Sequence, residues 1–470
     1  MFRDYTLGEV NESLIGKKVK LVGWADTIRA HGNFTFIDLR DRYGKVQGII
    51  DKKSADFLES KRVTTESCIQ IEGEIKSRPK GTENKDLVSG KVEIAISNLK
   101  ILTLASPLPF ELTKDDVNED LRLKYRYLDI RRTVMTKNLE LRHKIINFIR
   151  NYLDEKQFLE VTTPMLTKST PEGARDFIVP SRLHPGKFYA LPQSPQQYKQ
   201  LLMVAGIDKY FQIAACFRDE DARADRSPGE FYQLDMEMSF VEQKDILDLV
   251  EDMILKLVKE LLPSKKLTFQ KIPRLTYDEV MKKYGTDKPD LRKDKNNLDE
   301  LAFAFVVDFP LFELKKEEKK WGAVHHPFTR PKLEKDETIE QLIERIKKDP
   351  GEPFADQYDF VLNGYEIGGG SLRIHEPKLL EAIFEILGHM PEDITEKFGH
   401  LLNAFKYGVP PHGGIALGLD RIVMILEDEP SIREVIAFPK TGDGRDLMMN
   451  APSEVDDKQL KDLHIKTLKS

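Results

Sequence analysis

Five short runs of alternating hydrophobic and polar residues occupy the first 104 residues. They are 18–26, 34–41, 45–50, 68–76 and 91–97, each rich in Val, Ile or Phe, with Gly, Asn and Lys between them. A period of two residues is typical of a strand that buries one face. A short helical stretch is expected at 55–62, between the third and fourth runs. The pattern predicts a small all-β domain over residues 1–104.

The order of these elements narrows the type of barrel. Five strands with a helix after the third is the order of the OB fold, a partly open barrel that binds oligonucleotides. A fold does not fix a function. The strand pattern therefore leaves two alternatives open, a nucleic acid and some other ligand.

The period changes beyond the barrel. Pro107 and Pro109, followed by the charged segment 114–120, indicate a connector over 105–135. From Lys137 onward, apolar residues recur at steps of three and four, which predicts an amphipathic helix of about five turns over 137–156. The rest mixes strand and helix patterns without βαβ alternation. We therefore expect residues 136–470 to form an α+β domain, and the whole chain to be an α+β multidomain protein.

Composition restricts the class of protein. The chain has 470 residues, too many for one ordinary core, with 40% hydrophobic and 32% charged residues, as in water-soluble globular proteins. No apolar run approaches the roughly 20 residues of a membrane helix, and the N-terminus lacks a secretory pattern. The only cysteines, Cys68 and Cys216, form no CxxC pair, so a reducing cytoplasm is the expected location. The net charge of −6 excludes a uniformly basic chain but not a local basic face.

Two common nucleotide-binding sequences are absent. No GxGxxG precedes a predicted helix, and the chain has no GxxxxGK[ST]. If the protein binds ATP, it must do so with another kind of site.

The segment FRDEDARADRSPGEFYQLDMEMSF (217–240) has the densest charge. Seven charged residues fall within 218–226, and a strand pattern follows in which Gln233, Asp235 and Glu237 share one face. Arg218 suits an α-phosphate because its guanidinium donates two aligned hydrogen bonds. The alternative is a surface loop of mutually screened charges. The polar face of the following strand argues against that alternative.

Two further groups carry candidate chemistry. Asp359 and Glu366 flank an apolar strand, and an acidic pair next to a triphosphate suits Mg²⁺. The glycines at 368–370 remove side chains where a ligand could approach, although three glycines alone usually mark a turn or bulge. A helix beginning near Gly418 has Arg421 in its first turn, which favours a phosphate site. Without the other groups, Arg421 would be read as an exposed arginine.

These groups, in this order, resemble the three motifs of class II aminoacyl-tRNA synthetases. The helix 137–156 with FLEVTTPML (158–166) resembles motif 1, the dimer element ending in Pro164; FRDE (217–220) resembles motif 2; and GLDR (418–421) resembles motif 3. Residues 170–206, 325–329 and 364–375 are similar to the bacterial aspartyl-tRNA synthetases. The resemblance implies an OB-fold anticodon-binding barrel and a catalytic domain built on an antiparallel sheet flanked by helices. It also implies a homodimer that uses ATP and Mg²⁺ to join L-aspartate to tRNA(Asp).

The resemblance assigns roles to individual residues. The implied catalytic residues are Arg218, Glu366 and Arg421. The implied aspartate-binding residues are Glu172, Gln196, Lys199, Arg218, Asp235, His325, His326 and Arg373. The implied ATP-binding residues are Arg218, Asp219, Glu220, Ser227, Glu366, Gly418, Leu419, Asp420 and Arg421. The implied metal ligands are Asp359 and Glu366.

In the barrel, the resemblance implies four anticodon-reading residues, Arg29, Phe36, Gln47 and Glu93. Phe36 is a candidate platform for an unpaired base, and the alternative is an ordinary core aromatic. His31 and Gly81 match positions at which enzymes that charge both tRNA(Asp) and tRNA(Asn) tend to carry His and Gly. They imply a non-discriminating enzyme, against the alternative of neutral loop variation in an enzyme selective for tRNA(Asp).

The sequence departs from the family in two places. An insertion domain of about one hundred residues, an ordinary domain size, is absent near 290–300, and Gly229 is an apparent addition. The nearest rivals are an asparaginyl- or lysyl-tRNA synthetase, which TPEGARDF (170–177), Lys199 and RDED (218–221) argue against. A nucleic-acid-binding protein with an inactive synthetase fold is a rival of another class, and intact Arg218, Glu366 and Arg421 argue against it.

Overall fold

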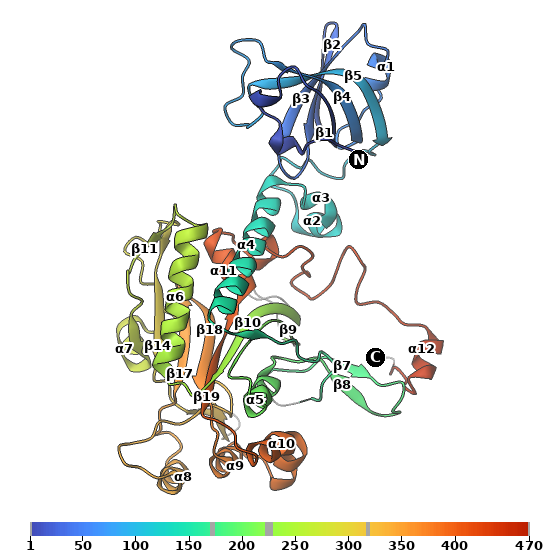
Figure 1. Cartoon of the computed structure of the whole chain (residues 1–470). Helices are drawn as coiled ribbons and strands as arrows, with labels where there is room; N and C mark the ends of the chain where they lie inside the picture. The colour runs from blue at the N-terminus through green and yellow to red at the C-terminus, as the bar shows by residue number, and fades with distance from the viewer. Residues whose placement is uncertain (1, 170–173, 221–228, 316–319, 469–470) are drawn as a thin grey trace. The chain divides into compact units, whose positions relative to one another are not determined.

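The computed structural model describes residues 2–169, 174–220, 229–315 and 320–468. It divides into two compact units, Met1–Arg132 and Thr133–Ser470 (Figure 1). The boundary falls inside the expected connector, so that most of 105–135 belongs to the first unit. Among the residues described, no helix is long and apolar enough to cross a membrane.

The first unit contains a closed five-stranded barrel with strand order β1-β2-β3-β5-β4. Its strands are β1 (Lys18–His31), β2 (Phe34–Arg40), β3 (Lys45–Asp51), β4 (Cys68–Ser77) and β5 (Val92–Thr103). Its helices are η1 (Leu7–Glu9), η2 (Glu12–Leu14), α1 (Phe57–Ser60), α2 (Glu119–Lys124) and α3 (Arg126–Asp129). The barrel is closed, not partly open as expected, because β3 also pairs in parallel with β5 at Gly48 and Ile49.

A buried carboxylate holds the segment that follows the barrel. Asp129 is fully buried and accepts hydrogen bonds from Arg122 (Nε, 2.9 Å) and Arg126 (Nη1, 2.5 Å), with Arg132 at 3.4 Å. Burial alone would raise the pKa of Asp129, but the three arginines outweigh it and hold that pKa below its usual value. Asp129 therefore stabilises this part of the first unit as an anion.

We expect Asp129→Asn to lower the unfolding free energy of the first unit by about 3 kcal/mol, because it leaves buried arginines without their counter-charge. Trp24 and Trp321 are the only tryptophans, and Trp24 lies in β1 with Arg131 over its ring at 5.0 Å. In a Trp321→Phe background, urea unfolding followed by fluorescence therefore reports on the first unit. Asp115→Asn is the matched control, since Asp115 also pairs with Arg132 but is 94% exposed. Equal unfolding free energies for the two variants would contradict the account.

The second unit is built on an eight-stranded sheet of order β12-β14-β17-β18-β19-β10-β9-β6, antiparallel except for the parallel edge pairs β12/β14 and β6/β9. The strands of the unit are β6 (Leu159–Glu160), β7 (Ile178–Pro180), β8 (Phe188–Ala190), β9 (Lys209–Arg218), β10 (Gly229–Ser239), β11 (Lys266–Leu267), β12 (Arg274–Thr276), β13 (Glu300–Leu301), β14 (Phe303–Val307), β15 (Phe312–Lys315), β16 (Lys320–Ala323), β17 (Gln357–Leu362), β18 (Tyr365–Leu372) and β19 (His412–Gly418). Its helices are α4 (Thr133–Glu155), α5 (Gln196–Val204), α6 (Gln243–Leu261), α7 (Tyr277–Tyr284), α8 (Ile339–Lys348), α9 (Pro377–Ile386), α10 (Pro391–Phe405), α11 (Leu419–Leu426), η3 (Ile432–Glu434) and α12 (Asp457–Asp462).

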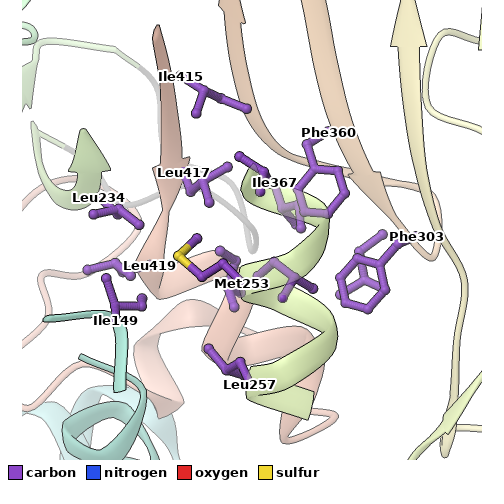
Figure 2. Close-up of a cluster of buried hydrophobic side chains, with 14 of the residues drawn as sticks. Ile149, Leu234, Met253, Leu257, Phe303, Phe360, Ile367, Ile415, Leu417 and Leu419 are labelled. Carbon is purple, nitrogen blue, oxygen red and sulfur yellow. The ribbon is translucent and has the colours of Figure 1, made fainter. Parts of the chain in front are cut away.

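One face of this sheet packs on α4, α6 and α11, and this is the main core of the unit. Figure 2 shows Met253 and Leu257 of α6 against Leu234, Ile415 and Leu417 of the sheet. Because side chains alternate along a strand, burying Leu234, Met236 and Met238 on this face turns their polar neighbours to the opposite face. The candidate functional residues lie on that opposite face.

Candidate active site

A cavity of about 540 Å³ lies on the face of the sheet opposite α6. The predicted site residues that line it are Gln196, Lys199, Arg218, Glu220, Asp235, His325, His326, Glu366, Arg373, Gly418, Asp420 and Arg421. They come from helices α5 and α11, from the segment that follows β16, and from strands β9, β10, β18 and β19 or the residues directly after them, far apart in sequence. The fold thus brings the three charged groups of the sequence together.

Two cations and two carboxylates form a buried cluster at the inner wall of the cavity. Lys199 Nζ lies 2.6 Å from Asp235 Oδ1 and 3.3 Å from Glu237 Oε2, and Arg373 Nε donates to Glu237 Oε1 at 2.9 Å. All four side chains are at most 2% exposed, so their mutual pairing is what makes burial of the charges tolerable. Sequence reasoning placed Glu237 on this face but gave it no role, because its partner Arg373 is 136 residues away.

The two carboxylates of this cluster differ in their surroundings. Burial favours a raised pKa for Glu237, but Arg373 and Lys199 outweigh it and lower the pKa to about 2. Burial raises the pKa of Asp235 despite Lys199, and its Oδ2 is buried without a hydrogen-bond partner. A buried acceptor without a donor is costly, and Asp235 Oδ2 is therefore available to a donor on a ligand.

The cations of the cluster keep hydrogen-bonding capacity. An ammonium has three N–H bonds and a guanidinium five. Lys199 donates one hydrogen bond, to Asp235, and forms an ion pair with Glu237; Arg373 uses four N–H bonds, two on Glu237 and one each on His326 Nε2 (2.6 Å) and Ser371 Oγ (2.7 Å). Within the described residues, each cation keeps at least one N–H for a ligand. Such donors suit the oxygens of a carboxylate.

Two adjacent histidines next to this cluster are uncharged. Burial, followed by the nearby cations Arg373 and Lys199, lowers the pKa of His325 to about 3. Burial also lowers the pKa of His326, and Arg373 donates to its Nε2. The hydrogen of His326 therefore lies on Nδ1, which is 3.2 Å from Thr329 Oγ1. Neutral histidines leave the positive charge of this cluster with Lys199 and Arg373.

Arg218 ends β9 at the mouth of the cavity. Its guanidinium lies over the ring of Phe231, 5.0 Å from the centroid, and in the strand register it faces Gly229. Gly229 has a φ of +83°, and a Cβ there would lie 3.1 Å from the Phe177 ring. Only glycine fits this position without strain, which explains the residue type at 229.

The hairpin β17–β18 brings Asp359 and Glu366 together on neighbouring strands. It turns at Asn363 and Gly364, both with positive φ. Burial, and then the charge of Glu366, raises the pKa of Asp359 well above its usual value. A divalent cation would relieve this repulsion. The described residues contain no cluster of three or more metal-ligating side chains, and Mg²⁺ needs only one or two carboxylates when phosphate oxygens and water complete its shell, so the pair fits that ion.

Different contacts explain why glycine occupies each of the three positions 368–370 in β18. A Cβ on Gly368 or Gly370 would collide with backbone of β19, at 2.6 and 2.1 Å. A Cβ on Gly369 would instead point between Asp359 Oδ1 (3.0 Å) and His325 Nε2 (3.7 Å). Close strand pairing explains the first two, and only Gly369 opens space between two candidate site residues.

Lys288 lines the cavity, and sequence reasoning missed it. Its Nζ lies 3.2 Å from Glu366 Oε2. The loop that carries it is fixed by the two-pronged pairing of Arg292 with Asp290, whose Cβ lies near the Gly364 turn. A lysine in a polar segment carries no periodic signal, and only the loop's position against β18 reveals it.

At the N-terminus of α11, the four residues of the GLDR segment face different surroundings. Arg421 lines the cavity and donates to the backbone oxygen of Glu366. Asp420 accepts from Arg142 of α4 and from the Tyr232 backbone N–H at 3.1 Å, so its carboxylate ties α11 to α4 and β10. Leu419 is buried in the main core. Gly418 and Arg421 are therefore the members with the clearest access to a ligand.

The structure leaves some predicted residues away from the cavity. Asp219 is half-exposed, pairs with Arg175 at 3.4 Å and lies outside the cavity lining. Pro164, the expected end of a dimer element, is exposed after β6. Glu172 and Ser227 lie outside the described residues.

The four predicted anticodon residues share one face of the barrel. Phe36 lies on the outer face of β2, half-exposed, because Thr35 and Ile37 take the inner positions. Arg29 pairs with Phe36 in the strand register and donates to Gln47 Oε1 at 3.3 Å, and Gln47 donates to Glu93 at 2.9 Å. His31 and Gly81 are exposed, in two other parts of the unit.

Comparisons with known proteins agree with both units. Residues 118–442 match the family of class II tRNA synthetases (D, K and N), and residues 19–102 match the OB-fold nucleic acid binding domain. The aspartate--tRNA(Asp/Asn) ligase of Dehalococcoides mccartyi (strain CBDB1) is 43% identical over 588 residues, covering 96% of this chain and 97% of its own length. That of Thermotoga maritima is 42% identical over 590 residues, covering 99% of each chain. Both alignments exceed the 470 residues of this chain, so both relatives contain residues without a counterpart here.

Solved structures share the fold at lower identity. The asparaginyl-tRNA synthetase of Pyrococcus horikoshii, complexed with asparaginyl-adenylate, superposes with a TM-score of 0.75 at 24% identity over 94% of this chain and 99% of that one. A putative aspartyl-tRNA synthetase from Leishmania major Friedlin superposes with a TM-score of 0.74 at 21% identity, over 93% of this chain and 92% of that one. The expected OB-fold barrel and class II catalytic domain are confirmed. The family model covers most of the catalytic unit, and relatives more than 40% identical align along nearly the whole chain. This chain therefore belongs to the class II tRNA synthetases, in the family of the aspartate--tRNA(Asp/Asn) ligases.

Proposed function

We propose that this protein joins L-aspartate to tRNA with ATP. The observation that carries the proposal is the pair of free N–H groups on Lys199 and Arg373 at the inner wall of the cavity. A side-chain carboxylate accepts both, whereas the amide of asparagine would turn an N–H₂ donor toward one of them. The relatives named as aspartate--tRNA(Asp/Asn) ligases support the same reaction.

The proposed reaction has two steps. The α-carboxylate of aspartate attacks the α-phosphorus of ATP, the bond to the β-phosphate oxygen breaks, and aspartyl-adenylate and pyrophosphate form. A ribose hydroxyl of the terminal adenosine of tRNA then attacks the aspartyl carbonyl carbon, AMP leaves with the electron pair of the mixed anhydride, and the hydroxyl proton passes to the departing phosphate. No enzyme side chain becomes covalently modified.

The residues of this chain contribute mainly position and charge. Arg218, at the cavity mouth, is proposed to contact both the aspartate α-carboxylate and the α-phosphate, and Arg421 is proposed to contact the terminal phosphates. Asp235 Oδ2 and Gln196 offer acceptors to the α-ammonium of aspartate. Asp359 and Glu366 would hold Mg²⁺, which when bound neutralises phosphate charge.

The amino-acid dependence of ATP–pyrophosphate exchange tests this proposal. L-aspartate is expected to support exchange, and L-asparagine and L-lysine are not. Exchange with asparagine or lysine would favour the rival synthetases, whose architecture is shared. Absence of exchange with every amino acid would favour an inactive synthetase fold.

We propose further that the barrel reads the anticodon through the connected side chains Arg29, Gln47 and Glu93, with Phe36 as a stacking surface. His31 and Gly81 have open surroundings, since a Cβ on Gly81 would have no atom within 4 Å. Exposed positions with open surroundings tolerate more than one anticodon neighbourhood, and they support aspartylation of both tRNA(Asp) and tRNA(Asn).

Phe36→Ala is expected to lower kcat/KM for tRNA by about 10- to 100-fold, since stacking of a base on an aromatic ring contributes about 1–3 kcal/mol. ATP–pyrophosphate exchange, which needs no tRNA, should stay unchanged. Phe36→Tyr, which keeps the ring, is the matched control. If kcat/KM for tRNA fell as far in Phe36→Tyr as in Phe36→Ala, the stacking role would be refuted.

The second unit also supports a homodimer. Leu159, Met165 and Leu166 are exposed on either side of Pro164, after α4. Sedimentation of the full chain at micromolar concentration should give twice the mass of one chain. We also propose that the residues present only in the relatives include the insertion domain expected near 290–300, where the segment 285–299 joins α7 to β13 in this chain.

A further inference from the structure

A row of three buried polar side chains leads from the protein interior to the cavity wall. Gln196 begins α5 and lines the cavity, Gln200 lies one turn later, and His412 begins β19. They are 5%, 0% and 1% exposed. The mechanism above uses only Gln196.

The hydrogen positions along this row follow from its chemistry. His412 Nδ1 lies 2.8 Å from the backbone oxygen of Pro410, and a carbonyl oxygen can only accept, so Nδ1 carries the hydrogen. Burial, partly offset by Glu237, lowers the pKa of His412 to about 4, so the ring is neutral near pH 7. His412 Nε2 is therefore an acceptor.

That acceptor fixes the amide of Gln200. Gln200 Nε2 lies 3.1 Å from His412 Nε2 and must donate to it. The oxygen of the same amide then points the other way, and it accepts from Gln196 Nε2 at 3.2 Å. Rotating the Gln200 amide by half a turn would place an oxygen against the lone pair of His412, which is unfavourable in a buried site.

We propose that Gln200 and His412 are positioning residues that hold the Gln196 amide with its oxygen directed to the α-ammonium of the amino-acid substrate. Within the described residues, Gln196 Oε1 makes no hydrogen bond of its own, whereas Nε2 is held by Gln200. A flipped amide would present N–H₂ to the ammonium, donor against donor. The inference rests on the proposed function for the identity of the ligand, but it concerns only the ammonium group.

Binding of L-aspartate and succinate, measured by calorimetry on the full chain, tests the proposal. Succinate has the same two carboxylates and lacks the ammonium. Gln200→Met keeps the length of the side chain and removes both hydrogen bonds. It should lower the affinity for L-aspartate about tenfold or more and change the affinity for succinate less than twofold. His412→Phe removes the acceptor for Gln200 together with the Nδ1 donor to Pro410, and it should give the same ligand-selective loss.

A double-variant comparison separates positioning from a general packing role. In a Gln196→Met background the acceptor is gone, so adding Gln200→Met should produce no further loss of aspartate affinity. The proposal would be overturned if folded Gln200→Met and His412→Phe lost affinity for both ligands equally, or if they kept full affinity for aspartate. Additive losses of aspartate affinity in the double variant would also overturn it. Failure of the proposed function appears differently, as absence of aspartate-dependent exchange in the unaltered protein.

Discussion

Arg218→Ala is expected to reduce aspartate-dependent ATP–pyrophosphate exchange by about a thousandfold or more. A fixed guanidinium that meets charge developing at phosphorus contributes on this scale. Arg218 suits the role because β9 ends there, at the cavity mouth, and the Phe231 ring restrains its guanidinium. No other arginine occupies that edge of the cavity lining among the described residues, since Arg373 and Arg421 come from β18 and α11.

Two controls accompany this variant. Arg218→Lys keeps the charge without the two-pronged donor and should recover only part of the rate. Arg445→Ala removes a half-exposed arginine whose side chain pairs with Asp443, and exchange should stay within twofold. Exchange within tenfold of the unaltered protein in Arg218→Ala would remove Arg218 from the mechanism.

Lys199→Met is expected to have the second largest effect, and it acts on both substrate use and stability. It removes an N–H donor proposed for the aspartate side chain, so kcat/KM for aspartate should fall by about 10³-fold. It also leaves Asp235 and Glu237 buried with Arg373 as their remaining cation in the cluster. The unfolding free energy should fall by about 3–5 kcal/mol.

A second substitution separates these two effects. Lys199→Met combined with Asp235→Asn removes one anion together with the cation, so the charge of the cluster is balanced again. Stability in urea should return toward that of the unaltered protein, while aspartate-dependent exchange stays lost. A double variant as unstable as Lys199→Met alone, or one that regains exchange, would contradict the charge balance described for the cluster.

The parts of the fold that depend on local periodicity were predictable from sequence. Alternation placed Gln233, Asp235 and Glu237 on one strand face, and α4 (Thr133–Glu155) lies close to the expected helix 137–156. The end of β1 was not predictable, because its continuation to His31 depends on pairing with β2 and not on its own composition. Barrel closure was missed for the same reason, since it depends on a short parallel contact between distant strands.

The candidate site also has features that were predictable from sequence and features that were not. Residue type and position identified Arg218, and the family resemblance added Lys199 and the role of Arg373, but contacts between distant segments determine what each side chain does. Lys288 reaches the cavity because its loop packs beside the Gly364 turn, and Asp420 is occupied by Arg142, 278 residues away. No periodic pattern records such contacts, and the hydrogen-bonded row behind Gln196 is of the same kind.

Aminoacylation with purified tRNA(Asp) and tRNA(Asn) in parallel, using labelled L-aspartate and ATP, tests the central claim most directly. We predict that aspartate becomes attached to both tRNAs and that labelled L-asparagine becomes attached to neither. Attachment to tRNA(Asp) alone would contradict the broad tRNA range inferred from His31 and Gly81. Attachment of asparagine, or of no amino acid at all, would contradict the assignment of the Lys199–Arg373 wall to the aspartate side chain.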